Sequence, residues 1–431
     1  MKRFFCRLAA KMVAVMIVLV MTFGIVDVWA PPAIEAQTAT VFIQSAPAPT
    51  PRPELQPVQL PAPDPMPVMV GDWRIGIVTQ DSSRDLESYL AALRMENHFG
   101  QDRISRTTSY WSAWSEMNRI TRTIENVHSL AAAGAQTIVF VQGVPGVTEA
   151  IRTTHEIFGD DILFIFVGSP LEPIEEISSV ADIVADHDFS SEGRAIIQQA
   201  ASMGADTFAH ISFPRHLLMA NIAERREQML EYADRYGIRW VELNAPDPMH
   251  LGLHHSQMFL VENMPKWIQE HGQNTAFFST NCGMQLPLIQ QIIEHGGLFP
   301  RQCCPSPFHM LPEALNISME GREEDTRFLM QQLSFELKNR GVQDRISTSA
   351  VSTNMLLVEV SVRYSIEFLE GRTNGRNDRA VFERVLQEVA GSFGTQVEFS
   401  NFLPWNGTYI NYFYRVLPGF ANFLNVIDGN D

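Results

Sequence analysis

The chain has 431 residues and a formal net charge of −17, from 32 basic and 49 acidic residues. An acidic chain repels the phosphate backbone of nucleic acids, so this balance argues against a nucleic-acid partner. The length exceeds what one hydrophobic core usually supports and indicates two lobes.

Residues 1–30 read as an export signal. Four basic residues within the first eleven precede the apolar run 12–26, and Ala/Pro-rich sequence follows. The run has fifteen residues, fewer than the roughly 20 that a membrane-spanning helix needs. Val28-Trp29-Ala30 has the small residues of a cleavage site, but Pro31 follows it, so a cleaved signal and an uncleaved N-terminal anchor both stay open. Either places the rest of the chain outside the cytoplasmic membrane, in the periplasm or at the cell surface.

Residues 31–70 are expected to form a disordered stalk. Eleven prolines occur between Pro31 and Pro67, with almost no apolar periodicity, which favours a stiff extended chain without a core. The folded part therefore begins near Gly71.

Strands and amphipathic helices alternate from Trp73 onward. Apolar runs predict strands, and the segments between them have helical spacing. In the first set, strands are expected at 73–79, 104–110, 137–141, 162–167 and 181–185, and helices at 83–99, 115–133 and 147–158. In the second set, strands are expected at 207–211, 238–243 and 275–279, and helices at 191–203, 217–236, 263–271 and 284–295. Continuous apolar strands between helices indicate parallel sheets covered on both faces.

The last third predicts helices at 320–340, 354–369 and 379–389, then an aromatic-rich end at 397–423 that forms strands or a packed tail. The expected fold class is α/β, with two doubly wound parallel-sheet lobes joined by a hinge. The expected domains are an N-terminal lobe at 71–189, a C-terminal lobe at 190–305, and a return segment at 306–431 that is shared between the lobes.

Two segments carry a resemblance to the type I periplasmic substrate-binding proteins, the ribose-binding and basic-membrane-protein-like receptors. Asp186-His187-Asp188-Phe189-Ser190-Ser191-Glu192-Gly193-Arg194 resembles the family's crossing from the first lobe into the second. Cys304-Pro305-Ser306-Pro307-Phe308, with Leu311-Pro312-Glu313-Ala314-Leu315, resembles the return crossing. The proline-rich leader and the Ser212–His216 turn resemble a branch known only as a domain of unknown function. The resemblance implies a two-lobed binding protein and implies no particular ligand.

Ligands of open parallel sheets bind outside the carboxyl ends of the strands, so the loops there supply the candidate residues. These residues provide hydroxyl and amide groups for hydrogen bonds, aromatic faces, one carboxylate and one guanidinium group. They are Thr79, Gln80, Ser82, Trp111, Gln142, Gly143, Ser169, Asp186, Ser212, Phe213, Arg215, Asn244, Thr280, Asn281 and Ser306. The structural alternative is that they are turn, core and capping residues, with Ser82, Ser83 and Ser190 capping helices, Arg215 in a surface ion pair and Asp186 fixing the hinge.

The histidine-rich stretch 247–255 favours a different class of protein. Asp247, His250, His254 and His255 could hold a metal in an envelope hydrolase, and His250 and His254 have the spacing of one helical face. Pro246 and Pro248 instead favour a loop with solvated histidines, and no HExxH, G-x-S-x-G or Walker A motif is present.

Three cysteines follow the leader, namely Cys282, Cys303 and Cys304. An exported chain can hold a bridge from Cys282 to one of the vicinal pair, with free buried thiols as the alternative. A zinc site is not expected, because CxxC spacing and a nearby histidine pair are both missing.

The sequence therefore predicts an exported, non-catalytic solute-binding protein without cofactor or metal. Its two lobes would close over a small polar ligand of unknown class and deliver it to a membrane permease or sensor. Two rivals remain open. One is the metal-dependent hydrolase, and the other is a cytosolic regulator of the same fold, in which a DNA-reading helix pair would stand where this chain has its leader.

Overall fold

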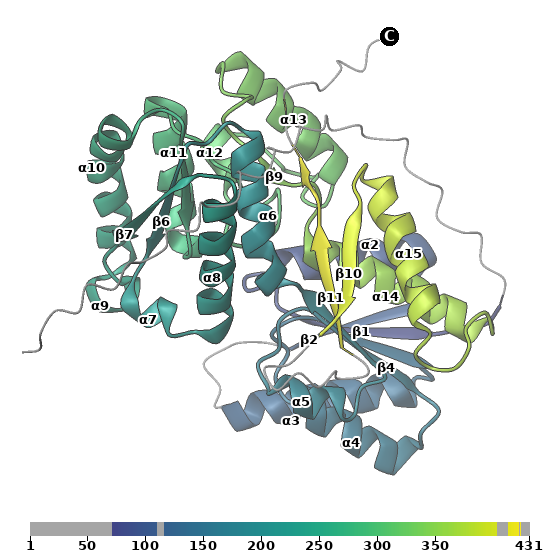
Figure 1. The fold of residues 1–431 in the computed structure, drawn as a ribbon. Helices are drawn as coiled ribbons and strands as arrows, with labels where there is room; N and C mark the ends of the chain where they lie inside the picture. The colour runs from purple at the N-terminus through teal and green to yellow at the C-terminus, as the bar shows by residue number, and fades with distance from the viewer. Residues whose placement is uncertain (1–70, 110–115, 403–412, 422, 424–431) are drawn as a thin grey trace, which may run out of the picture. The chain divides into compact units, whose positions relative to one another are not determined.

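The computed structural model describes residues 71–109, 116–402, 413–421 and 423. Two parallel sheets organise this part of the chain (Figure 1). The leader at 1–30, the stalk at 31–70 and Trp111 lie outside the described residues. None of the helices in the described ranges is long and apolar enough to cross a membrane.

The first sheet has seven strands in the order β10-β11-β5-β4-β3-β1-β2. Its strands are β1 (Ile75–Gln80), β2 (Ile104–Ser109), β3 (Thr137–Phe140), β4 (Leu163–Val167), β5 (Ile183–His187), β10 (Val397–Asn401) and β11 (Phe413–Pro418). All neighbours pair in parallel except β10, which is antiparallel to β11. The Ile, Val and Phe residues of β1, β3 and β4 are buried, as expected for strands covered on both faces.

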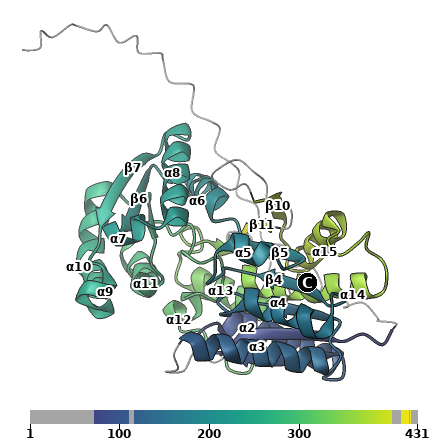
Figure 2. The ribbon, with the colours of Figure 1, turned by 90° about the horizontal axis from the view of Figure 1, so that it is seen from below.

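Six helices cover the two faces of this sheet. They are α2 (Leu86–Phe99), α3 (Glu116–Ala132), α4 (Val147–Phe158), α5 (Ile174–Ser178), α14 (Thr353–Leu369) and α15 (Arg379–Ser392). Figures 1 and 2 show α3, α4 and α5 on one face, and α2, α14 and α15 on the other. Asp85 caps α2 and Asp188 caps α6, where the sequence suggested serines.

The second sheet has the order β7-β6-β8, with all three strands parallel. Its strands are β6 (Thr207–Ser212), β7 (Arg239–Asn244) and β8 (Thr275–Ser279). Alternate residues of its strands face different helices. Phe208 and Phe278 pack with α6 (Phe189–Ser202) and α8 (Ala220–Arg235), while Ile211 and Phe277 pack with α10 (Leu253–His271) and α11 (Gln285–His295). This is the period-two alternation of a strand between two layers.

Short elements complete the second lobe. They are α7 (Pro214–Leu217), α9 (Pro248–Leu251), the 3₁₀ turn η1 (Cys282–Met284), α12 (Leu311–Leu315), α13 (Thr326–Asn339), and the antiparallel pair β9 (Thr348–Ser349) and β12 (Phe420–Ala421). The expected helix at 217–236 corresponds to α8, which begins three residues later, and the expected helix at 263–271 begins ten residues earlier despite Pro265.

The chain passes between the two sheet layers three times, at 187–189, 350–353 and 418–420. The second passage differs from the expected return near Pro305. Leu311, Leu315 and Leu333 belong to the second core, whereas Val351 and Met355 belong to the first. The segment that sequence reasoning took for a return is a loop of the second lobe, because its apolar residues pack on α11 and α13.

Candidate functional site

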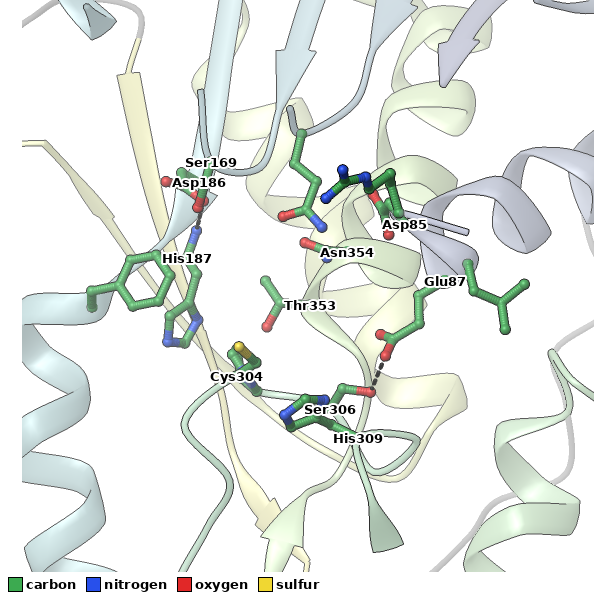
Figure 3. A pocket seen from close by; sticks show the side chains of 15 residues that line it. Asp85, Glu87, Ser169, Asp186, His187, Cys304, Ser306, His309, Thr353 and Asn354 are labelled. Carbon is green, nitrogen blue, oxygen red and sulfur yellow. Dashed lines mark hydrogen bonds between the residues drawn. The ribbon is translucent and has the colours of Figure 1, made fainter. Parts of the chain in front are cut away.

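A cavity of about 320 Å³ lies where β1, β3, β4 and β5 of the first sheet end (Figure 3). The neighbours β1 and β3 lead into helices on opposite faces, which makes this edge the switch point where open α/β sheets bind ligands. The cavity is lined by Arg84, Asp85, Leu86, Glu87, Gln142, Ser169, Asp186, His187, Phe189, Cys304, Pro305, Ser306, His309, Thr353 and Asn354. Residues from both lobes therefore meet around one space.

Asp186 is the last but one residue of β5 and is 8% exposed. Its Oδ1 accepts a hydrogen bond of 2.7 Å from the backbone N–H of His187, and Ser169 Oγ lies 3.5 Å away. Burial raises the pKa of Asp186 to about 7, although these donors and the charge of Arg415 oppose the shift. Near neutral pH the carboxyl group is therefore poised between its neutral and charged forms.

Glu87 lies in the first turn of α2, on another side of the cavity from Asp186 (Figure 3). Its carboxylate accepts hydrogen bonds from the hydroxyls of Ser306, at 2.8 Å, and Ser352. Burial of the carboxylate raises the pKa of Glu87 to about 7 as well. Glu87 thus links α2 to the cysteine-containing loop and to the second passage of the chain.

Asp85 is the third carboxylate of the cavity. Its Oδ1 accepts from the backbone N–H of Ser88 at 3.1 Å, while Oδ2 is buried and has no hydrogen-bond partner among the described residues. Burial raises the pKa of Asp85 also. Within the described part of the chain, none of Asp85, Glu87 and Asp186 forms a salt bridge, so no cation in direct contact compensates these carboxylates.

Glu192 of α6 is a buried carboxylate that does not line the cavity, and it is paired with two cations. Arg225 Nη1 donates to its Oε2 at 2.9 Å, and the Nε of Arg301 lies 3.4 Å from its Oε1. Burial alone would raise the pKa of Glu192, but contact with His187 and the two guanidinium groups lowers it to about 2. Burial lowers the pKa of His187, so its imidazole is neutral. We call Glu192, Arg225 and Arg301 the ionic hub.

A larger cavity of about 440 Å³ lies at the start of α4. One of its acidic lining residues, Glu172, already accepts hydrogen bonds from the backbone N–H groups of Val147 and Thr148, at 2.6 and 3.0 Å. The carboxylate of Glu172 therefore already occupies the anion position at the start of α4. The 320 Å³ cavity, whose carboxylates form no salt bridge with the described residues, is the stronger candidate site.

Four of the predicted ligand residues line the candidate site, namely Gln142, Ser169, Asp186 and Ser306. Three others support its edge or lie just outside it. Gln80 donates to the Gln142 carbonyl at 3.0 Å, Thr79 is fully buried, and Ser82 is an exposed turn residue. Gly143 has a φ of +67°, and a Cβ there would lie 1.9 Å from Gln80 Nε2, so the backbone conformation and the Gln80 side chain both favour glycine without a ligand role.

The predicted residues of the second lobe form a separate group at the ends of β6, β7 and β8. The Ser212 and Thr280 hydroxyls are 2.8 Å apart, and His216 Nδ1 lies 2.8 Å from Thr280 Oγ1. Phe213 is fully buried in the second core, which leaves it no open ring face for a ligand. Asn281 caps η1, and Asn244 is exposed at the end of β7.

Arg215 is engaged by Asp247. Its Nε and Nη2 donate to the two carboxylate oxygens at 2.6 and 2.8 Å, in the bidentate geometry of a guanidinium–carboxylate pair. The guanidinium group that was predicted to bind a ligand is therefore engaged by Asp247, and Arg215 does not line the cavity.

The histidine stretch does not assemble a metal site. Asp247 binds Arg215 and caps α9, while His250, His254 and His255 are exposed on α9 and α10. Among the residues that the structure describes, one group of Cys, His, Asp and Glu converges closely enough to hold a metal, and its members are Cys282, Cys303, Cys304 and His309. The hydrolase alternative loses its basis, because Arg215 engages Asp247 and the three exposed histidines do not converge with it on one point.

Several cavity residues were missed from the sequence. Asp85 and Glu87 follow the loop that was singled out and could have been found by extending it into the first helical turn. Cys304 and His309 lie beside Ser306 in the same loop. Thr353 and Asn354 come from the second passage, which sequence reasoning placed elsewhere, so no local signal indicated them.

The two sheet layers, the three passages and the cavity at the strand ends define the two-lobed fold of a type I periplasmic binding protein. The chain belongs to DUF3798, a family described as proteins of unknown function, whose profile matches residues 73–347. Two uncharacterized proteins of Treponema pallidum (strain Nichols) are similar to it. One is 36% identical over 37% of this chain and 74% of its own length, and the other is 32% identical over 42% and 82%.

A solved structure with the same fold comes from Clostridium difficile 630 and is described as a candidate transcriptional regulator. It has a TM-score of 0.70 and 19% sequence identity, over 82% of this chain and 100% of that chain. A sugar ABC transporter protein of Actinomyces odontolyticus aligns with a TM-score of 0.48 and 10% identity, over 82% of this chain and 97% of that chain. At 19% identity the likeness to the Clostridium difficile structure concerns the fold alone.

Proposed function

We propose that this chain is an extracytoplasmic, non-catalytic solute-binding protein that closes its lobes over a small polar ligand and presents it to a membrane permease or sensor. The single observation that carries the proposal is the cavity with Asp85, Glu87 and Asp186, two buried carboxylates and one half-buried carboxylate that form no salt bridge with any described residue. Buried carboxylates are normally paired, and a ligand that brings donors or a positive charge would supply the missing partner. The N-terminal signal supports the location outside the membrane.

The ligand is expected to carry an amino group or a comparable cluster of hydrogen-bond donors. Only Arg84 among the lining residues carries a fixed positive charge, and it is exposed at the edge. Gln142, Ser169, Ser306 and Asn354 can orient the remaining polar atoms.

Closure would follow from ligand contacts that involve both lobes. The cavity is lined by α2 and the ends of first-sheet strands on one side and by the 304–309 loop of the second lobe on the other. A ligand that binds both sides favours the closed state by its extra contacts there.

The test is native mass spectrometry of the purified chain before and after mild denaturation, followed by calorimetry with small amines and neutral sugars of similar size. We expect a releasable amine-containing molecule and a smaller radius of gyration in its presence. Asp186→Asn should weaken amine binding at least about tenfold, as expected for loss of a buried charged partner. Glu398→Gln, on an exposed side chain, is the matched control.

Binding of such a cation should weaken as the pH falls below 7. Protonation of Glu87 and Asp186, whose pKa values are raised to about 7, removes the negative charge that attracts it. Unchanged scattering and calorimetric heats across both ligand classes would contradict the binding function. Tight sugar binding that ignores pH would contradict only the ligand class.

A further inference from the structure

The three cysteines that follow the leader converge with one histidine in the second lobe. Cys282 is the first residue of η1, three positions after the end of β8, while Cys303, Cys304 and His309 belong to the loop before α12. The Sγ of Cys282 lies 3.1 Å from the Sγ of Cys303 and 3.1 Å from that of Cys304. Cys303 Sγ lies 3.8 Å from Cys304 Sγ and 3.9 Å from His309 Nε2. All four ligand atoms lie within 4.8 Å of one another.

This donor set is one that structural zinc sites use. Zinc prefers four ligands in a tetrahedron, and three thiolates with one imidazole are among its common combinations. With zinc–sulfur bonds of about 2.3 Å, the sulfurs of a tetrahedral site lie about 3.8 Å apart. The distance between the Cys303 and Cys304 sulfurs already has this value. An outward shift of the Cys282 sulfur by less than about 1 Å would bring its distances to the other two sulfurs to the same value.

The electrostatic surroundings favour a negatively charged metal site. Arg225 and Arg301 of the ionic hub are buried and share one carboxylate, which leaves one positive charge in excess. Arg225 donates to the Cys303 carbonyl at 3.2 Å, and its charge acts on Cys282. Arg301 acts on Cys304, and its three guanidinium nitrogens have no hydrogen-bond partner among the described residues. Three thiolates, one neutral imidazole and a divalent cation carry a net charge of −1, which balances the excess.

A disulfide explains the cluster less well. Sulfurs at 3.1 Å are not bonded, since a disulfide requires about 2.05 Å, and Cys282 is equally far from both candidates. One bridge would use two sulfurs and leave the third thiol and His309 without a role. A metal ion engages all four groups at once.

We propose that Cys282, Cys303, Cys304 and His309 bind a divalent metal of the zinc class, in a closed tetrahedral site that fixes the 303–309 loop. Each thiol releases its proton to solvent on binding, and no oxidant is needed. Cys304, Ser306 and His309 form one side of the cavity (Figure 3), and Ser306 donates to Glu87. The metal would therefore hold this side of the cavity in place without having to touch the ligand.

The test uses the full chain, purified without reductant. Elemental analysis should find one zinc ion per chain, and Co²⁺ added after chelation should give the thiolate charge-transfer band and intense visible absorption of a tetrahedral site. Cys282, Cys303 and Cys304 should resist N-ethylmaleimide until a chelator is added, with peptide mapping to keep Cys6 separate. His309→Ala should weaken Co²⁺ binding at least about 100-fold, because loss of a direct ligand exceeds the effect of outer partners.

The matched control is His250→Ala, which removes an exposed histidine of the rejected 247–255 cluster and should leave Co²⁺ binding unchanged. Circular dichroism shows whether His309→Ala is folded. If this variant is unfolded, the N-ethylmaleimide reactivity of the unsubstituted chain with and without chelator still tests the metal site. A Cys282 disulfide in the purified chain overturns the proposal, as do three thiols that react without chelator. These readouts do not depend on any solute, so the metal site and the solute-binding function can fail separately.

Discussion

Asp186 and Glu192 are buried carboxylates only six residues apart, on either side of the chain's first passage between the lobes. Asp186 faces the cavity and forms no salt bridge with the described residues, and burial raises its pKa to about 7. Glu192 contacts two guanidinium groups, and its pKa is lowered to about 2. The same chemical group is thus left uncompensated on one side of the passage and compensated on the other. Full compensation indicates a structural role, and its absence indicates a place for a ligand.

The two carboxylates also respond to pH in opposite ways. A native pKa above the unfolded value makes stability fall as the pH rises between the two, whereas a lowered pKa makes stability fall as the pH drops through it. Asp186 should therefore oppose folding at neutral and alkaline pH, and Glu192 should support folding above about pH 4.5. A ligand that pairs with Asp186 would remove the destabilisation caused by its buried charge, so ligand binding would raise the stability of the protein.

The largest effect is expected for Glu192→Gln. Removing the acid leaves Arg225 and Arg301 buried without a counter-charge, and breaking a buried pair in this way costs about 3–5 kcal/mol. Urea denaturation at pH 7 measures the change in the free energy of unfolding. Glu398→Gln, which removes an exposed partner of Arg194, should change it by less than about 0.5 kcal/mol. A loss below about 1 kcal/mol for Glu192→Gln would show that the hub is not structural.

Asp186→Asn should show the opposite behaviour in the free protein. The amide keeps an acceptor for the His187 N–H but does not ionise. The free energy of unfolding of the variant, relative to that of the unsubstituted chain, should therefore rise by about 2–3 kcal/mol as the pH goes from 5 to 8. Unfolding curves at the two pH values measure this gain. His187 and His210, whose pKa values are lowered by burial, titrate in both proteins and cancel in the difference. A difference that does not change with pH would mean that Asp186 is not protonated near neutrality.

Ser306→Ala should have a smaller effect, because it removes one hydrogen bond between the lobes. The hydroxyl donates to Glu87 at 2.8 Å and accepts from the Phe308 N–H at 3.1 Å. A bond to a charged group contributes about 1.5–3 kcal/mol at most, and Ser352 still donates to Glu87, so a loss of about 1–2 kcal/mol is expected in urea denaturation. Ser178→Ala, which removes only a local bond to a backbone carbonyl, is the control. Equal losses for both variants would argue against a Glu87 link.

The strand–helix order of the sheets could be predicted from the sequence because buried strands such as Leu163–Val167 are continuous apolar runs. The position at which the chain returns to the first lobe could not be predicted from the sequence. Leu311 and Leu315 have the same apolar character wherever they pack, and only the three-dimensional core assigns them to the second lobe. The metal-capable cluster was missed for a related reason, since 21 residues separate Cys282 from Cys303 and only tertiary structure brings them together.

Within the candidate site, residues at strand ends were predictable and residues from other segments were not. Asp186 lies near the carboxyl end of β5 and Ser169 lies just after β4, so the switch-point rule finds them. Arg215 satisfies the same rule, yet Asp247 occupies its guanidinium group. A loop position predicts that a side chain can reach a ligand, but a protein partner can take its place.

The smallest effect is therefore expected for Arg215→Ala. Arg215 is 47% exposed, and exposed ion pairs contribute little because water and salt screen them, so the urea midpoint should not change measurably. Calorimetry on the same variant extends the comparison to the second lobe. Unchanged affinity would mean that Asp186 and its neighbours hold the ligand without Arg215. A tenfold loss would mean that Arg215 leaves Asp247 for the ligand when the lobes close, and that the second lobe also supplies charge to the site.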